Sequence, residues 1–174
     1  MIRIAITGPE STGKSWLTSQ LAAFYNAPFV IEYSREYLEA LQRPYTYDDI
    51  LNIAKGQLKL ENEAARNSCA NVLFADTDQL VNYIWCKVKY NKVHPWIADT
   101  MVTHRYQHYL LCDIDLPWES DPLREHPHRR EEIFELYVKT LELNGLPYTI
   151  IQGNGELRFF NAIAAVNKIL NPAH

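Results

Sequence analysis

Five short apolar runs recur along the chain, and longer polar segments separate them. Their apolar positions are nearly continuous rather than alternating, which is typical of parallel strands covered on both faces. The predicted strands span residues 2–7, 29–33, 71–75, 109–114 and 148–152.

Segments with helical periodicity lie between these strands. The longest spans residues 47–66, where Thr46 and Asp49 have the spacing of a capping box. The other predicted helices span residues 15–25, 34–41, 79–89, 97–104, 130–143 and 156–170. Strands that alternate with helices predict an α/β fold with right-handed crossovers, and we expect one domain over residues 1–174.

Residues 8–15 read GPESTGKS and match the phosphate-binding pattern G-x-x-x-x-G-K-[ST] between a predicted strand and a predicted helix. Gly8 and Gly13 allow the backbone N–H groups to turn inward, and the helix N-terminus adds its positive end. Lys14 is expected to reach the β- and γ-phosphates, and the Ser15 hydroxyl to hold Mg²⁺. We therefore predict a P-loop NTPase fold, a three-layer sandwich with a five-stranded parallel sheet. The residues expected to contact the nucleotide are Gly8, Glu10, Ser11, Thr12, Gly13, Lys14, Ser15 and Trp16.

Composition argues against several other classes of function. A net charge of −4 disfavours nonspecific nucleic-acid binding, and the longest apolar runs are too short for a membrane span. The three cysteines have no CxxC pairing, and the first residues enter a strand without the apolar region of a signal peptide. We expect a cytoplasmic protein that binds a small molecule, with neither nucleic acid nor membrane as a partner.

Acidic residues follow the third predicted strand. Ligands of a parallel sheet bind beyond the carboxyl ends of its strands, where Asp76 is placed to orient Mg²⁺. Asp78 has two interpretations: it caps the following helix, or it contacts substrate.

The second predicted strand leads into the sequence Glu32-Tyr33-Ser34-Arg35-Glu36-Tyr37. Its carboxylates could bind sugar hydroxyls or accept the proton of an attacking hydroxyl, and Arg35 could neutralise phosphate charge. Acids are also favoured at any helix N-terminus, which is the alternative for Glu32 and Glu36.

Residues 116–130 contain three prolines and form the least regular segment, which we expect to be a mobile flap. Arg124 and Arg129 could clamp a transferring phosphoryl group, or they could belong to a solvated basic turn. Tyr33, Tyr37 and Trp118 could stack on a planar base, and each could instead be plain packing.

The blocks GPESTGKS, EYSREY, DTD and CDIDLPWESDPLR, in this order, resemble the NadR-type ribosylnicotinamide kinase domain over nearly the whole chain. The resemblance implies a nucleoside-kinase-like fold with a lid and ATP-dependent phosphorylation of the 5′-hydroxyl of nicotinamide riboside to nicotinamide mononucleotide. It implies triphosphate and Mg²⁺ roles for Gly13, Lys14 and Ser15. Asp76 matches the acid after the third strand, and Arg124 matches the lid arginine.

The sequence departs from the family pattern in two places. Pro122 stands where the family often has glycine. The H-x-G-H signature of the family's adenylyltransferase domain does not occur in this sequence, so we expect no such activity from this chain.

The leading hypothesis is thus a kinase in which Lys14, Arg124 and Arg129 stabilise the transferring phosphoryl group. Asp76 or Glu36 would orient or deprotonate the acceptor hydroxyl. Glu32, Tyr33, Arg35, Tyr37, Asp78 and Trp118 are the expected substrate-binding residues. The alternatives are a kinase for another nucleoside or nucleotide, and a regulatory ATPase that binds a protein partner.

Overall fold

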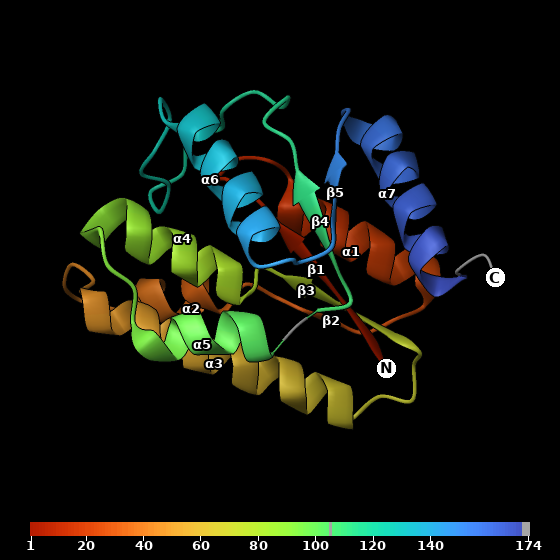
Figure 1. The fold of residues 1–174 in the computed structure, drawn as a ribbon, viewed down its shortest axis with the longest axis horizontal. Coiled ribbons are helices and arrows are strands. Elements are labelled where there is room, and N and C mark those ends of the chain that lie inside the picture. Colours follow the sequence, from red (N-terminus) through yellow and green to blue (C-terminus); the bar gives the residue numbers. More distant parts are fainter. Residues whose placement is uncertain (105, 172–174) are drawn as a thin grey trace.

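The computed structural model describes residues 1–104 and 106–171. Its centre is a five-stranded parallel sheet in the order β2-β3-β1-β4-β5 (Figure 1). The strands are β1 (Ile2–Thr7), β2 (Phe29–Val30), β3 (Val72–Asp76), β4 (His108–Cys112) and β5 (Tyr148–Ile151). In the register of the central strand, Ile4 is paired with Phe74 on one side and His108 on the other.

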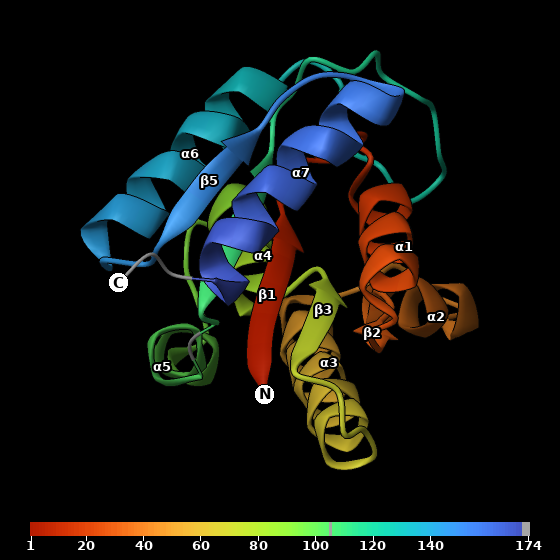
Figure 2. The same ribbon diagram turned by 90° about the vertical axis from the view of Figure 1, so that its right-hand side faces the viewer.

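Helices cover both faces of this sheet and give three layers (Figures 1 and 2). On one face lie α1 (Lys14–Tyr25) and α7 (Gly155–Leu170). On the other face lie α4 (Gln79–Tyr90) and α6 (Arg130–Leu143), with α5 (Pro95–Thr103) and α3 (Tyr47–Arg66) packed against α4. The short helix α2 (Tyr33–Ala40) follows β2 at the edge of the sheet.

The central strand shows why the apolar pattern is nearly continuous. Ile4 and Ile6 are fully buried in the cluster that contains Leu17 of α1, whereas Ala5 is buried in the cluster that contains Leu80 of α4. Successive side chains of a strand point to opposite faces, so a sheet covered twice needs apolar residues at consecutive positions. The predicted fold class is confirmed.

Most predicted elements agree with the structure to within one or two residues, and the predicted capping box of Thr46 and Asp49 is present at the start of α3. The predicted strand over residues 29–33 is wrong in its length. Only Phe29 and Val30 pair with β3, and Tyr33 already belongs to α2. The Tyr33 N–H donates to Gln57 Oε1 at 2.8 Å, so a side chain of α3 replaces the sheet as its partner. Among the described residues, no helix combines the length and apolar character that crossing a membrane requires.

Candidate active site at the carboxyl edge of the sheet

A cavity of about 390 Å³ lies at the carboxyl edge of the sheet, where the topology predicts a ligand. Residues 8–16 form one wall, and the other walls come from α2, α4, α6 and the segment between β4 and α6. We call the part between α2 and α4 the acceptor compartment. It is lined by Glu32, Ser34, Leu38, Val81, Trp85 and Val88.

The phosphate loop, residues 8–15, has the backbone that its two glycines were predicted to allow. Gly8 has φ of 132°, and a Cβ atom there would lie 2.9 Å from the carbonyl oxygen of Cys112, so only glycine fits against β4. Gly13 has φ of 76° and is the N-cap of α1. The Lys14 Nζ donates to the Pro9 carbonyl oxygen at 2.7 Å. The lysine is therefore held across the loop that it is expected to serve.

Asp76 ends β3 and is buried directly behind Ser15. Its Oδ1 is one of five buried side-chain atoms without a hydrogen-bond partner among the described residues. The pKa of Asp76 is raised to about 6, chiefly by burial and also by the nearby Glu32 carboxylate, against the lowering effects of a Ser15 hydrogen bond and Lys14. A free carboxylate oxygen beside a hydroxyl is a donor set that suits Mg²⁺, which prefers oxygen ligands. Ser15 and Asp76 therefore fit the predicted metal site.

Asp78 is fully buried, and its Oδ1 accepts a hydrogen bond from the Val81 N–H at 2.9 Å and from the Thr7 hydroxyl at 3.3 Å. The capping interpretation is thus confirmed, because Asp78 is the N-cap of α4. Burial raises the pKa of Asp78 to about 7. Asp78 is not among the cavity-lining residues, and its contact with substrate stays a prediction. Thr77, between the two acids, lines the cavity with φ of 69°, a backbone conformation that is costly for a β-branched residue.

Helix α2 brings some of its predicted residues to the cavity and leaves others outside. Glu32 and Arg35 line the cavity. Glu36 is exposed and is not part of the lining. Tyr33 packs its ring against Gly56 of α3, so closely that a Cβ atom at Gly56 would lie 2.0 Å from the ring. Tyr37 donates its hydroxyl hydrogen to Asp49 Oδ1 at 2.8 Å, on the side of α2 that faces α3. The two tyrosines thus fix α2 on α3 in this structure.

The flap, residues 116–130, is docked on the phosphate loop. The Glu10 carboxylate accepts hydrogen bonds from the N–H groups of Glu125 at 3.1 Å and His126 at 3.0 Å. The Ser11 hydroxyl accepts from the Glu119 N–H at 2.8 Å. Arg130 donates to the Ser11 carbonyl oxygen at 3.1 Å. Arg124 Nη1 and the Pro117 carbonyl oxygen each lie 3.4 Å from the Ser11 hydroxyl oxygen. Six flap residues therefore contact the phosphate loop through Glu10 and Ser11.

The predicted arginines of the flap differ in position. Arg124 lines the cavity, whereas Arg129 is the N-cap residue of α6 and pairs with Glu132 at 2.7 Å, outside the cavity lining. Arg35 of α2 pairs with Asp121 of the flap at 2.9 Å. Trp118 is half-buried in the flap and does not line the cavity, so its predicted stacking role has no contact to support it in this structure.

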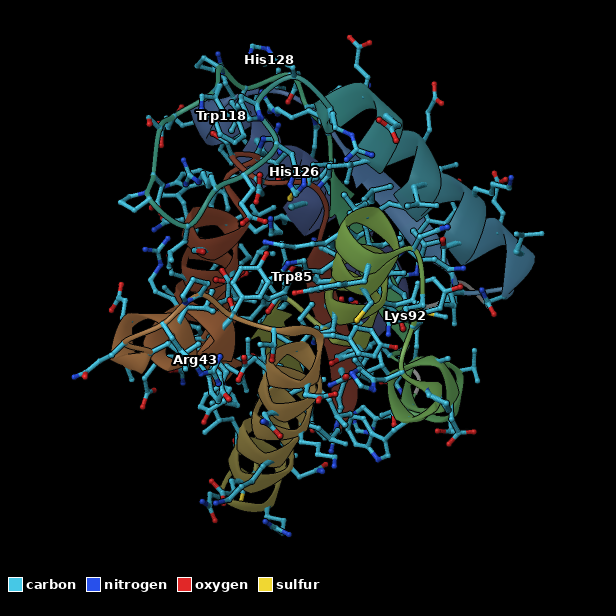
Figure 3. The ribbon with its side chains drawn as sticks, turned by 90° about the vertical axis from the view of Figure 1, so that its left-hand side faces the viewer. Arg43, Trp85, Lys92, Trp118, His126 and His128 are labelled. Atoms are coloured by element: carbon cyan, nitrogen blue, oxygen red, sulfur yellow. The ribbon has the colours of Figure 1, made fainter. Side chains whose placement is uncertain are left out.

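Trp85 is a cavity residue that was not predicted from the sequence. Figure 3 shows it projecting from α4 toward the space that α1 and α2 face, below His126 of the flap. Val81, Ile84 and Val88 line the cavity from the same helix. Their spacing of three and four residues identifies one face of α4, but every amphipathic helix has such a face, and only the tertiary structure shows what it meets.

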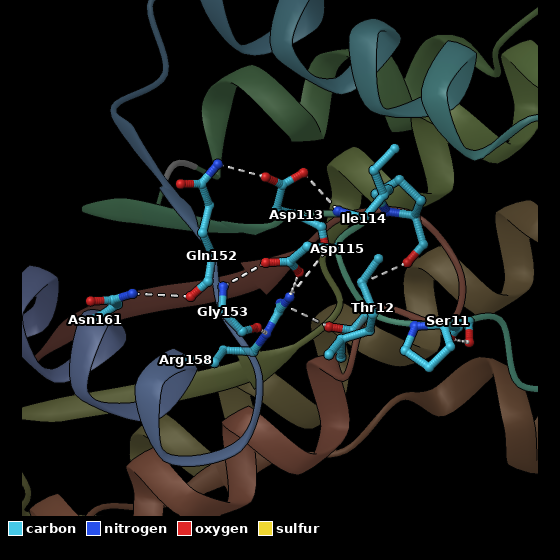
Figure 4. Close-up of polar contacts among 12 residues, drawn as sticks. Ser11, Thr12, Asp113, Ile114, Asp115, Gln152, Gly153, Arg158 and Asn161 are labelled. Carbon is cyan, nitrogen blue, oxygen red and sulfur yellow. Dashed lines mark hydrogen bonds and ion pairs between the residues drawn. The ribbon is translucent and has the colours of Figure 1, made fainter.

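Arg158 is a second missed residue and ties three loops of this edge together (Figure 4). Its side chain is fully buried at the start of α7. It donates to the carbonyl oxygens of Gly153 at 2.7 Å, Thr12 at 3.0 Å and Asp113 at 3.3 Å, and it forms an ion pair with Asp115. The Asp115 carboxylate in turn accepts from the Gly153 N–H at 2.5 Å. Arg158 therefore joins the phosphate loop to the loops after β4 and β5.

Known proteins resemble this chain in sequence over nearly its whole length. A family model described as an AAA domain (AAA_28) matches residues 3–158. The trifunctional NAD biosynthesis/regulator protein NadR of Escherichia coli K12 is 28% identical over 96% of the chain, and that of Salmonella typhimurium LT2 is 27% identical. The chain spans 42% of the length of each of these two relatives.

Solved structures agree with this relationship. NadR protein in complex with NR superposes with a TM-score of 0.84 at 28% identity, covering 97% of this chain and 51% of that one. NadR protein in complex with NAD and AMP-PNP gives 0.80 at 26% identity, with 97% and 49% covered. Deoxyadenosine kinase from M. mycoides, at 15% identity and a TM-score of 0.66 over 96% of this chain and all of that one, shares the fold. The chain belongs to the AAA_28 family of P-loop domains and is a homologue of the NadR proteins.

Proposed function

We propose that this chain is an ATP-dependent kinase that phosphorylates the 5′-hydroxyl of nicotinamide riboside (NR) to nicotinamide mononucleotide. The observation that carries the proposal is that one cavity contains both the phosphate loop and the acceptor compartment. A donor phosphate on the loop and a hydroxyl in the compartment would share a single enclosed space, as in-line transfer requires. The NadR complexes with NR and with AMP-PNP support this choice of ligands.

The acceptor compartment has the character that a cationic aromatic ring needs. Trp85 offers the face of an indole, which attracts a pyridinium ring by about 0.5–2 kcal/mol. Val81 and Val88 supply apolar surface beside it, and Glu32 supplies a negative charge. We therefore propose that Trp85 takes the stacking role for which the sequence suggested Tyr33, Tyr37 and Trp118.

The phosphate side of the cavity has the charge that a triphosphate needs. Lys14 would exchange the Pro9 carbonyl oxygen for phosphate oxygens, and Arg124 and Arg35 line the same space. These cations would stabilise the charge that spreads over the transferring group. Mg²⁺ held by Ser15 and Asp76 would neutralise part of the phosphate charge.

The proton of the acceptor hydroxyl needs a carboxylate that faces the cavity. Glu32 does so, and the Ser34 hydroxyl donates to its Oε1 at 2.5 Å, which fixes its orientation. Asp76 lies behind Ser15, and Glu36 is exposed outside the lining. We propose that Glu32 accepts the proton, whereas the leading hypothesis from the sequence gave this role to Asp76 or Glu36.

An acceptor panel tests the proposed activity. Purified protein with ATP and Mg²⁺ is expected to release ADP in proportion to added nicotinamide riboside, with nicotinamide mononucleotide detected by mass spectrometry. The Lys14→Ala variant serves as the control for contaminating kinases. A different nucleoside that stimulates ADP release more strongly would redirect the assignment, and basal hydrolysis unchanged by every nucleoside would favour a regulatory ATPase.

Substitutions of Glu32 and of Glu36, four residues apart, test which carboxylate accepts the proton. Glu32→Gln is expected to lower kcat about a hundredfold, because the amide keeps the shape but cannot take the proton. Glu36→Gln, the matched control, should stay within about twofold, because an exposed surface substitution disturbs little. The measurement is the initial rate of product formation at saturating ATP and riboside. The opposite ranking would restore Glu36 to the role predicted from the sequence.

A further inference from the structure

The hydroxyl of Tyr45, in the loop between α2 and α3, connects the flap to the acceptor compartment. It accepts a hydrogen bond from Trp85 Nε1 at 2.9 Å and donates one to Glu125 Oε2 at 2.6 Å. Lys89 Nζ lies 2.5 Å from the same hydroxyl oxygen and 2.8 Å from Glu125 Oε1. A phenol has one donor and two acceptor positions, so all three are in use.

The other end of Glu125 is fixed to the phosphate loop. Its main-chain N–H donates to both oxygens of the Glu10 carboxylate, each at 3.1 Å, and the His126 N–H donates to Glu10 as well. Glu10 lies inside the loop where the phosphates are expected, and it lines the cavity. A continuous series of hydrogen bonds thus runs from Glu10 through Glu125 and Tyr45 to Trp85. We call these four residues the relay.

A triphosphate seated on the loop places several negative charges next to the Glu10 carboxylate, and like charges at short range in a partly enclosed site repel strongly. The hydrogen bonds from the Glu125 N–H to the Glu10 carboxylate must then change. A shift of Glu125 in turn changes its hydrogen bond with Tyr45, and through Tyr45 the one with Trp85. Within the described part of the chain, the indole of Trp85 makes one polar contact, its hydrogen bond to Tyr45, and the Tyr45 ring lies 5.0 Å away in an edge-on arrangement. The state of the loop can therefore reach Trp85 through bonds that are all present in the structure.

We infer that the relay Glu10–Glu125–Tyr45–Trp85 makes Tyr45 and Glu125 positioning residues, which couple occupancy of the phosphate loop to the orientation of Trp85. The inference about the loop and Trp85 stands on the contacts alone. Its consequence for acceptor affinity rests on the proposed function.

Fluorine NMR of protein labelled with 5-fluorotryptophan tests the relay without any acceptor. The chain has four tryptophans, and Trp85→Phe identifies the Trp85 resonance. In the wild type, saturating Mg²⁺ and AMP-PNP are expected to shift this resonance. In Tyr45→Phe the shift should fall at least about threefold, because a relay with one bond removed transmits little of its coupling. Tyr47→Phe is the matched control, since Tyr47 neighbours the relay, stacks on His94 and lies outside the cavity lining.

A substitution at Glu10, the end of the relay farthest from Trp85, separates coupling through the relay from a local disturbance of Trp85. In Glu10→Gln the partners of Trp85 are unchanged, so a loss of the Trp85 response at an AMP-PNP concentration that saturates this variant must come through the flap. A Trp85 shift of wild-type size in both Tyr45→Phe and Glu10→Gln would overturn the relay. Titration of nicotinamide riboside forms the second arm. AMP-PNP is expected to change the affinity of the protein for nicotinamide riboside about fivefold in the wild type and less than about twofold in Tyr45→Phe. If the riboside does not bind the wild type, the proposed function fails, while the fluorine signal still decides the relay.

Discussion

Replacing Asp76 by asparagine is expected to slow the proposed phosphoryl transfer about a thousandfold while making the protein more stable. The activity falls because the amide has the shape of the carboxylate but lacks the charge beside Ser15 that the proposed metal site needs. The rate of nicotinamide mononucleotide formation at saturating substrates measures this effect. Turnover that stays within tenfold of the wild type would remove Asp76 from the proposed machinery.

The gain in stability follows from the same buried position. Burial is the main cause that raises the pKa of Asp76 from an ordinary 3.8 to about 6. The folded protein therefore binds this proton more tightly than the unfolded chain does, so stability is lost as the pH rises from about 4 to about 6. Above that window the ionised carboxylate costs about 3 kcal/mol of unfolding free energy. Asparagine has no charge to bury and avoids this loss.

Urea unfolding at pH 8 and at pH 4, in EDTA, measures the difference. The asparagine variant is expected to exceed the wild type by about 3 kcal/mol at pH 8 and to match it near pH 4. Asp99→Asn is the matched control, since Asp99 is an exposed residue of α5. An equal difference at both pH values would mean that burial of the charge is not the cause.

Replacing Arg158 by methionine is expected to lower the free energy of unfolding by about 3 kcal/mol. Methionine fills part of the volume but donates no hydrogen bond. The carbonyl oxygens of Thr12, Gly153 and Asp113 would lose the donor that they share, and Asp115 would lose its cation. Asp115 reaches solvent, so most of the loss is expected from the buried carbonyl groups.

Denaturation followed by circular dichroism measures this loss. Arg66→Met is the control, because Arg66 is an exposed residue in the last turn of α3. A loss below about 1 kcal/mol in Arg158→Met, comparable with an ordinary surface substitution, would contradict the structural role of the arginine.

The parts of the site that the sequence could predict are those encoded by neighbouring residues. The phosphate loop, the cap at Asp78 and the acid at the end of β3 each lie within one strand–turn–helix unit, whose backbone follows from local patterns. The length of β2 could not be predicted this way. The N–H of its last expected residue, Tyr33, donates to the Gln57 side chain of α3. The sequence around residue 33 does not indicate a hydrogen-bond partner on another helix.

The missed residues all act across long stretches of chain. Arg158 meets Thr12 from 146 residues away, and Tyr45 meets Glu125 from 80 residues away. Trp85 has no unusual neighbours in sequence, and its place in the cavity depends on how α2, α4 and the flap pack. Polar networks of this kind join loops that the order of the strands in the sheet brings close together. The periodicity and spacing of residues along the chain therefore do not predict these contacts.

The order of the strands also determines how long β1 must wait for its partner strands during synthesis. The central strand β1 pairs with β3 from Val72 onward and with β4 from His108 onward. At roughly 5–20 residues per second, a ribosome needs several seconds after β1 to deliver β3, and longer to deliver β4. Until β3 is made, a strand with the sequence IRIAIT has two open edges, and one edge stays open until β4 is made. The strand on which the phosphate loop is built is therefore the one that depends longest on protection during synthesis.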